Sequence, residues 1–462
     1  MQIKTFKMGQ FQSINSKTVR LSILDDSVAL DETYDRVERM LRNFCDTNEE
    51  KEILSCWEKA VSKKCRNPLQ LWSAFGLAMR ALENWGKHRS FLAFSIRQVE
   101  LSQEFEKSSD LFAGMDSVNS AILVADSYLN MAKGNLLMSQ YKNSEKYATK
   151  CLSVLCSVRK SNLNAIKLSG YAYLYKARSN LGFSNFRNAL EDLERSLRVA
   201  HDQEDRRLEC FACCAMGALY LQLKDYEKGN FFSIKSCEIW TQCGSSWSTR
   251  TKVTTQLNLA EAYRKVGKIE DAMVIGEEAM KIAIENDDRS CQAYAMLCFA
   301  DIHRVRKDEE RSLPRYNSAS GLMLDTGDQF GYMMSTIGKA KLYLQTKDYQ
   351  KAIQEYFAGQ KIAEAIGNKI TSMHIHGELA LLFQRLSNQD EARVRTLRYH
   401  RLLETMELFC GICAEPMAEK NEQLEALPCS HFFHLKCVSN NDALEMRMCP
   451  SCQKKPMKQA TL

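Results

Sequence analysis

Residues 349–360 read YQKAIQEYFAGQ, and this stretch decides the fold of most of the chain. We interpret it as part of a repeating unit of a helix, a short polar turn and a second helix. Tyr349 lies at the edge of the turn, where the second helix begins. In that helix a small residue, Ala352, lies three positions on, and the bulkier Tyr356 lies seven on. Another small residue, Gly359, lies ten on. Small residues at this spacing let one helix lie close against the next, as stacked helical hairpins require.

The same pattern recurs upstream. The clearest further copies are Phe186, Ala189, Leu193 and Ser196, then Tyr226, Gly229, Ser233 and Ser236, and then Ile269, Ala272, Gly276 and Ala279. The position at the edge of the turn is Glu50, His88, Tyr141, Phe186, Tyr226, Ile269, Glu309, Tyr349 and Gln389 in successive copies, and the last three intervals are each 40 residues. This period exceeds the roughly 34 residues of a tetratricopeptide repeat, so longer helices or longer loops are expected. A generic helical bundle with accidental spacing is the alternative, which three equal intervals disfavour.

We therefore predict an all-α fold, a superhelical tetratricopeptide-repeat solenoid over residues 34–388 that follows an irregular segment, residues 1–33. The array should be right-handed, with seven to nine hairpins and a concave face that binds a peptide. Turns such as Lys224-Asp225-Tyr226 are interpreted simply as repeat turns.

Composition agrees with a helical, soluble, intracellular protein. Six prolines in 462 residues are too few for a protein of strands and loops, and the 45% hydrophobic content allows a large core. The net charge is +6, and no run of basic residues interleaves with aromatic ones, so no nucleic-acid partner is expected. No apolar run approaches the roughly 20 residues of a membrane span.

Residues 389–409 are expected to form a basic amphipathic helix that runs directly into the C-terminal module. Its apolar stripe is Ala392, Tyr399, Leu403, Met406 and Phe409, and its basic residues are Arg393, Arg395, Arg398 and Arg401. Two interpretations stay open. The helix either caps the array with a solvated basic face, or binds an acidic amphipathic partner segment through Arg393, Arg395 and Arg398, for example as a short coiled coil.

Residues 410–452 carry eight candidate zinc ligands in four close pairs. Thiolate and imidazole are ligands that zinc prefers. Because the second and third pairs overlap, alternate pairs are predicted to share an ion. One zinc ion would take Cys410, Cys413, His434 and Cys437, and a second would take Cys429, His431, Cys449 and Cys452. No ligand position is left open, so both sites are structural. A disulfide cluster is the alternative, disfavoured in a cytosolic chain.

This order and spacing resemble a RING finger of the RING-H2 type. Many such domains recruit a ubiquitin-conjugating enzyme through an apolar residue between the first two cysteines and a proline after the seventh ligand. The resemblance gives these roles to Ile412 and Pro450, and the alternative is that both only pack and turn the loop. Efficient ligases often have an arginine after the last ligand, whereas this chain has the uncharged Gln453 at the start of its basic tail, residues 453–462.

Several peptides, together with this domain order, resemble the rapsyn family over residues 35–452. They are Cys298–Arg304 (CFADIHR), Pro314–Tyr316 (PRY), Asp225–Lys228 (DYEK) and Leu427–His431 (LPCSH). The resemblance implies a scaffold at the cytoplasmic face of the postsynaptic membrane that binds cytoplasmic loops of nicotinic acetylcholine receptors. It implies self-association through the repeats, receptor contact through the helix before the RING, and a link to dystroglycan and the cytoskeleton. The alternative function is a RING-type ligase for ubiquitin or NEDD8 that selects substrates with its repeats.

The N-terminus contains a lipidation signal that does not start at the first residue. Met8-Gly9-Gln10-Phe11-Gln12-Ser13 fits the M-G-x-x-x-[ST] myristoylation pattern, and the family that the chain resembles begins at a Met-Gly-Gln of this kind. We therefore expect translation from Met8 to yield a form acylated on Gly9 that contacts the membrane peripherally.

Overall fold

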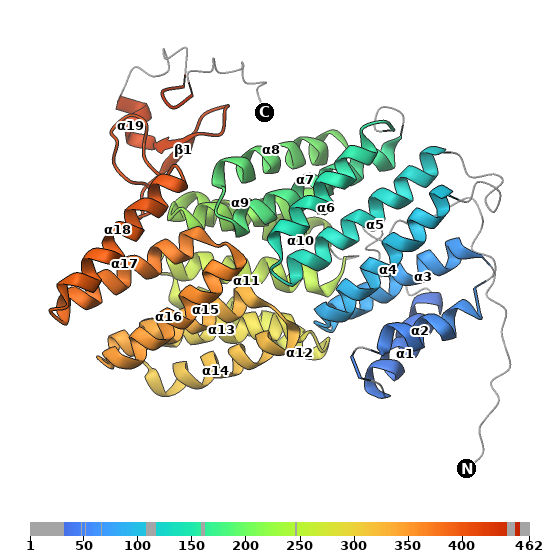
Figure 1. Ribbon diagram of the computed structural model, residues 1–462, viewed down its shortest axis with the longest axis horizontal. Coiled ribbons are helices and arrows are strands. Elements are labelled where there is room, and N and C mark those ends of the chain that lie inside the picture. Colours follow the sequence, from blue (N-terminus) through green and yellow to red (C-terminus); the bar gives the residue numbers. More distant parts are fainter. Residues whose placement is uncertain are drawn as a thin grey trace.

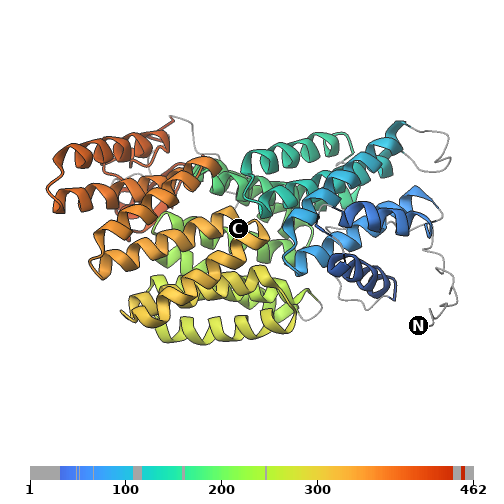
Figure 2. The same ribbon diagram turned by 60° about the horizontal axis from the view of Figure 1, so that its bottom comes forward.

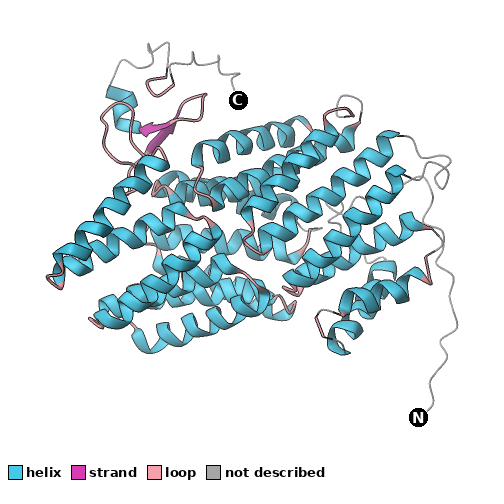
Figure 3. Ribbon diagram, viewed as in Figure 1, coloured by secondary structure: helices cyan, strands magenta, loops and turns pink. Residues whose placement is uncertain are grey.

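Helices form most of the described part of the chain in the computed structural model shown in Figure 1, and the only strands that it describes are two short ones near the C-terminus (Figure 3). The structure describes residues 32–452, apart from residues 48, 51, 66, 108–116, 159–161, 245–246 and 441–448. The predicted irregular segment, the Met8 start, Gly9 and the basic tail therefore lie almost wholly outside the described residues.

The elements follow one another as antiparallel hairpins. Their bounds are α1 (Glu32–Thr47), α2 (Ile53–Ser62), α3 (Pro68–Asn84), α4 (His88–Lys107), α5 (Ser117–Leu137), α6 (Tyr141–Leu155), α7 (Leu163–Gly182), α8 (Phe186–Asp202), α9 (Arg206–Gln222), α10 (Tyr226–Cys243), α11 (Thr249–Lys265), α12 (Ile269–Glu285), α13 (Arg289–Val305), α14 (Glu309–Thr326), α15 (Gln329–Gln345), α16 (Tyr349–Ile366), α17 (Lys369–Arg385), α18 (Gln389–Thr405), β1 (Leu424–Ala426), β2 (Phe432–His434) and α19 (Leu435–Asn440). The prediction of an all-α repeat solenoid with a small C-terminal zinc-finger domain is confirmed.

The repeat register follows the pattern read from the sequence. From His88 onward, every predicted turn-edge residue is the first residue of a second helix, whereas the most N-terminal one, Glu50, precedes α2 by three residues. The repeat period of 40 residues exceeds the roughly 34 residues of a tetratricopeptide repeat because the helices are long. For example, α13 and α14 are 17 and 18 residues long, and the connections that follow them hold only three and two residues.

One local device makes most of these turns. A residue in the left-handed region ends one helix, as at Lys224 with φ 61° and Lys347 with φ 64°. An aspartate then caps the next helix, because its side chain accepts a backbone N–H from three residues on, as Asp225 does from Lys228. Such a cap typically contributes about 1 kcal/mol. The polar turns in the sequence therefore fix where each helix starts.

The superhelix returns on itself, so turns far apart in sequence meet (Figure 2). The Asn368 side chain donates to the carbonyl of Gly182 at 2.9 Å, and the backbone N–H of Ile370 donates to Ser184 Oγ at 2.8 Å. One repeat earlier, the N–H of Phe330 donates to Ser139 Oγ at 2.9 Å. Turns of one superhelical circuit thus dock on turns of the next.

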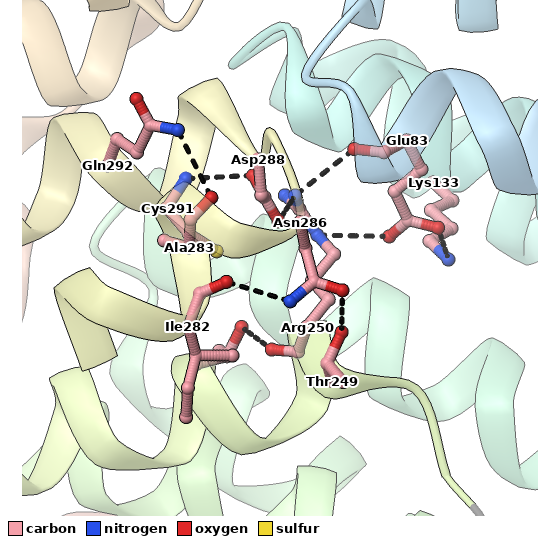
Figure 4. A network of polar contacts seen from close by, with 11 residues as sticks. Glu83, Lys133, Thr249, Arg250, Ile282, Ala283, Asn286, Asp288, Cys291 and Gln292 are labelled. Atoms are coloured by element: carbon pink, nitrogen blue, oxygen red, sulfur yellow. Dashed lines mark hydrogen bonds and ion pairs between the residues drawn. The ribbon is translucent and has the colours of Figure 1, made fainter. Parts of the chain in front are cut away.

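Near the N-terminal end of the array, a buried charge network also joins helices that are far apart in sequence (Figure 4). Arg250, at the start of α11, pairs with Asp288, the N-cap of α13, and donates to the carbonyl of Glu83 in α3 at 3.1 Å. The Glu83 carboxylate pairs with Lys133 of α5. Burial alone would raise the pKa of Glu83, but Lys133 and Arg250 hold it below its usual value. The network was not predicted from the sequence.

Candidate metal centre

The chain enters the C-terminal module directly from the last hairpin. An isolated bridge pairs Phe409 with Pro416, and the Cys410 N–H donates to the Glu415 carbonyl at 2.9 Å. The tight turn between them places Ala414 in the left-handed region, with φ 59°. This turn brings the first two cysteines to one point, which is the local geometry that a shared metal ion needs.

The first set of ligands brings the first and third pairs together. Cys410, Cys413, His434 and Cys437 present one atom each, all within 4.8 Å of one another. His434 Nδ1 lies 3.4 Å from Cys413 Sγ and 3.9 Å from Cys437 Sγ. The strand β2 carries His434, and the short helix α19 carries Cys437, so the small sheet and helix complete the site.

The second set joins the second and fourth pairs. Cys429, His431, Cys449 and Cys452 also present their ligand atoms within 4.8 Å of one another. His431 Nδ1 lies 3.3 Å from Cys429 Sγ across a turn in which Ser430 is left-handed, with φ 59°. The structure therefore gathers the eight residues into the same two alternating groups that the sequence analysis expected.

The donor sets fit zinc. Each offers three thiolates and one imidazole, which suit a tetrahedral zinc ion and do not suit magnesium or calcium. His434 is buried, and its second ring nitrogen, Nε2, lies 3.3 Å from the Glu422 carboxylate while making no hydrogen bond among the described residues. A carboxylate facing the outer nitrogen of a ligating histidine orients the ring for metal binding. The site can hold metal structurally but leaves no open position for catalysis.

The module docks on the array at turns that the sequence analysis read only as repeat turns (Figure 1). Asp225 caps α10 and also accepts the backbone N–H of Leu424 in β1 at 2.9 Å. Lys224 Nζ donates to the Glu419 carbonyl at 2.8 Å, and Lys228 Nζ lies 2.7 Å from the Glu425 carboxylate. The module therefore occupies the place where a further repeat of the closed superhelix would dock.

Apolar contacts continue across the same junction. The ring of Phe432 in β2 packs edge-on against Tyr220 of α9, with centroids 6.4 Å apart. Leu424, Phe433 and Cys410 belong to the same hydrophobic cluster as the middle of the array. No periodicity in the sequence points to these contacts, because they join segments about 200 residues apart.

The predicted conjugating-enzyme residues each adjoin a candidate zinc ligand, Ile412 beside Cys413 and Pro450 beside Cys449. Ile412 and Pro450 are both half-buried, and the loops that carry them meet, because a β-carbon added at Gly411, the neighbour of Ile412, would lie 3.8 Å from Pro450 Cβ. Gln453 lies outside the described residues.

The three predicted receptor-binding arginines have different environments. Arg393 and Arg398 are exposed on α18, whereas the Arg395 side chain is only 11% exposed. Arg395 pairs with Glu391 at 3.1 Å, donates to Gln360 of α16 at 3.2 Å and lies over the ring of Phe357. Arg395 thus holds α18 against α16, and only the other two face solvent.

The helix that carries them is the second helix of the last hairpin. Of its predicted apolar stripe, Ala392 and Leu403 are buried and Tyr399 is half-buried, where its hydroxyl donates to Glu419 of the module. On the opposite side, Val394 and Leu397 are 42% and 63% exposed. The exposed surface of α18 is therefore both basic and apolar. None of the described helices is long and apolar enough to cross a membrane.

Comparison with protein families gives three matches. A model described as the rapsyn N-terminal myristoylation and linker region matches residues 28–109, and one described as a RING-like zinc finger matches residues 410–438. A model of anaphase-promoting complex subunit 5 matches residues 137–227 and 244–306, within the repeat array.

Two curated relatives cover almost the whole chain. The 43 kDa receptor-associated protein of the synapse from Tetronarce californica is 34% identical over 428 residues, which is 93% of this chain and 98% of the relative. The protein of the same name from Gallus gallus is 35% identical over 428 residues, which again is 93% of this chain and 98% of the relative. Among solved structures, the Rap conjugation gene regulator of the plasmid pLS20, in complex with the Phr* peptide, has a TM-score of 0.52 at 9% identity. The match covers 81% of this chain and 96% of the chain in that structure. At this identity the likeness concerns the fold alone.

Proposed function

The chain belongs to the rapsyn family, the 43 kDa receptor-associated proteins of the synapse, and from that premise we propose that it is a scaffold that gathers nicotinic acetylcholine receptors by their cytoplasmic loops. The carrying observation is the relationship over 93% of the chain, from the repeats to the zinc finger. In this proposal the repeats self-associate, and the RING end, held by two zinc ions, links receptors to dystroglycan and the cytoskeleton. The protein acts at the cytoplasmic face of the postsynaptic membrane.

The exposed face of α18 is the proposed receptor contact. It combines the cations Arg393 and Arg398 with the exposed side chains of Val394 and Leu397. An acidic amphipathic segment would pair its carboxylates with the arginines and bury its apolar side against the aliphatic residues. Arg395 serves this contact indirectly, by fixing the helix to α16.

Reversing both exposed charges tests the contact. We expect Arg393→Glu with Arg398→Glu to weaken receptor binding at least tenfold and to abolish co-clustering in transfected cells, because like charges across an interface cost several kcal/mol. The readout is receptor co-localisation, with self-association measured in parallel.

Arg289→Glu is the matched control, because Arg289 is exposed on the array far along the chain from α18. Co-clustering should survive in that variant. If it also survives the double reversal, the receptor contact lies in the repeats and not on α18.

Membrane attachment is proposed to come from acylation of Gly9 in a form that starts at Met8. The family model that matches residues 28–109 is described as a myristoylation and linker region, and the Met8–Ser13 signal lies upstream of that match, which supports this proposal. One myristoyl chain gives only marginal and reversible membrane binding, so bound receptor would supply the second contact. We expect mass spectrometry of the native protein to find a chain that begins at acylated Gly9. A mature chain beginning only at Met1 or Gln2 would refute the internal start.

A ligase activity is the second candidate, and it is favoured because the two loops that carry Ile412 and Pro450 meet beside the metal site. All six cysteines of the zinc finger belong to the two metal groups, so it would act by holding a ubiquitin-conjugating enzyme and not through a nucleophile of its own. Conjugation of ubiquitin or NEDD8 that is lost in Ile412→Ala would support this activity. Equal conjugation in both proteins would show that Ile412 only packs.

A further inference from the structure

A groove on the repeat array lies outside every site described above. It has a volume of about 330 Å³ and runs between α12 and α14, over the C-terminal half of α13. Arg311 and Arg315 of α14 line one wall, Glu270 and Glu277 of α12 line the other, and Phe299 of α13 lies between them. One wall is therefore basic and the other acidic.

The glutamates do not neutralise the basic wall. Glu270 pairs with Arg306, at the C-terminal end of α13, at 2.6 Å. Arg311 is 69% exposed, and its nearest carboxylate, Asp308, is 3.6 Å away. Arg315 donates to the carbonyl of Arg311 at 2.8 Å, and across the described part of the chain no carboxylate lies within ion-pair distance of it. Arg311 and Arg315 thus keep most of their donor capacity.

His303 is a buried histidine that lines the groove and is sensitive to the charges around it. It is only 5% exposed and has no hydrogen-bond partner for Nδ1 among the described residues. Asp308 Oδ2 lies 3.4 Å from that nitrogen, outside hydrogen-bond geometry. Burial lowers the pKa of His303. The positive charge of Arg315 lowers it further, and this effect is larger than the opposing effect of Asp308. A buried polar atom without a partner is costly, and a ligand could supply one.

Apolar side chains lie beside the charged ones, so the groove can hold a ligand larger than one small ion. Met273 and Phe299 contribute to its lining. Val274, the neighbour of Met273 on α12, is 65% exposed. A ligand with apolar groups on both sides of an anionic group would therefore bury more surface here than a free anion would.

We propose that this groove is a second protein-binding site, which takes an acidic peptide segment of a partner by holding a carboxylate between Arg311 and Arg315, beside His303. Arginine suits this role because its planar fork matches a carboxylate in two parallel hydrogen bonds. The acidic wall accepts backbone N–H groups of the same segment. The site is separate from the receptor contact on α18, so either proposal can fail without the other.

The test uses the full-length protein with ¹³C-labelled histidine rings, because the chain has only eight histidines. His303→Gln assigns the signal of His303. The probe is a short peptide of alternating valine and glutamate with blocked ends, and its glutamine counterpart is the neutral control. We expect the acidic peptide alone to shift the His303 signal and to raise the pKa measured from it, because a bound carboxylate favours the charged ring.

Arg315→Gln should weaken this binding at least tenfold, because it removes the charge-assisted hydrogen bonds of Arg315 to the carboxylate. Arg289→Gln is the control and should bind as the unaltered protein does, because Arg289 is an exposed arginine at the start of α13 that does not line the groove. No shift of His303 with the acidic peptide, or equal binding by Arg315→Gln, would overturn the proposal. A shift with inorganic phosphate but not with the peptide would also overturn it, and would assign the groove to small oxyanions.

Discussion

Replacing Cys413 with alanine is expected to unfold residues 410–452 and to leave the repeat array helical. The substitution leaves one ion with Cys410, His434 and Cys437 as its only protein ligands. In a module this small, metal binding is folding energy, on the order of 10–16 kcal/mol for a structural zinc ion. Metal analysis of the full-length protein should give two zinc ions per chain before the substitution, and one or none after it.

The unfolding should also release the module from the array. Asp225 and Lys228 would lose their partners Leu424 and Glu425 in β1, and Tyr220 would lose Phe432. Limited proteolysis should therefore cut within residues 410–452, while circular dichroism at the helical wavelengths falls only slightly. Cys156→Ser is the matched control, because Cys156 is an exposed cysteine outside the module and should keep two ions. A zinc content of one in the unaltered protein would contradict the two-ion assignment.

The sequence predicted the repeat register because every signal it needs is local. The left-handed turn residue, the aspartate cap and the small residues of each second helix fall within about a dozen positions, so Tyr226 and Tyr349 could be placed from their neighbours alone. The prediction was three residues off only at Glu50. The grouping of the eight ligands is also local, because overlapping pairs restrict how two ions can share them.

The closure of the superhelix could not be predicted in this way. Asn368 meets Gly182 across 186 residues, and Asp225 meets Leu424 across 199, so no periodicity relates the partners. Such contacts depend on the small rotation between successive hairpins, which accumulates along the array. The environments of the arginines depend instead on how α18 packs against the neighbouring hairpin, because Arg395 contacts α16 while Arg393 and Arg398 stay exposed. A run of arginines in the sequence does not distinguish these environments.

Removing Arg250 is expected to open the N-terminal end of this closure. Its side chain is 15% exposed and faces Asp288, whose side chain is 4% exposed. Arg250→Ala would leave Asp288 buried without its cation, and breaking a buried pair from one side typically costs about 3–5 kcal/mol. The carbonyl of Glu83 would lose a donor at the same time. We expect a lower free energy of unfolding and faster hydrogen exchange in residues 83–90 and 286–292.

Arg264 supplies the control, because it lies on the same helix α11 and is also buried in ion pairs. Its partners, Glu261 and Asp301, lie on α11 and on α13 in the next hairpin, so its pairs do not join distant turns of the superhelix. Arg264→Ala should lower stability by less, because Asp301 keeps Arg304 and Glu261 keeps Lys265, and the extra exchange should appear around residues 261–264 and 301. The two variants thus separate the loss of a buried charge pair from the loss of closure. If Arg250→Ala leaves exchange at residues 83–90 unchanged, the turn-to-turn hydrogen bonds at Ser139 and Ser184 hold the superhelix closed without it.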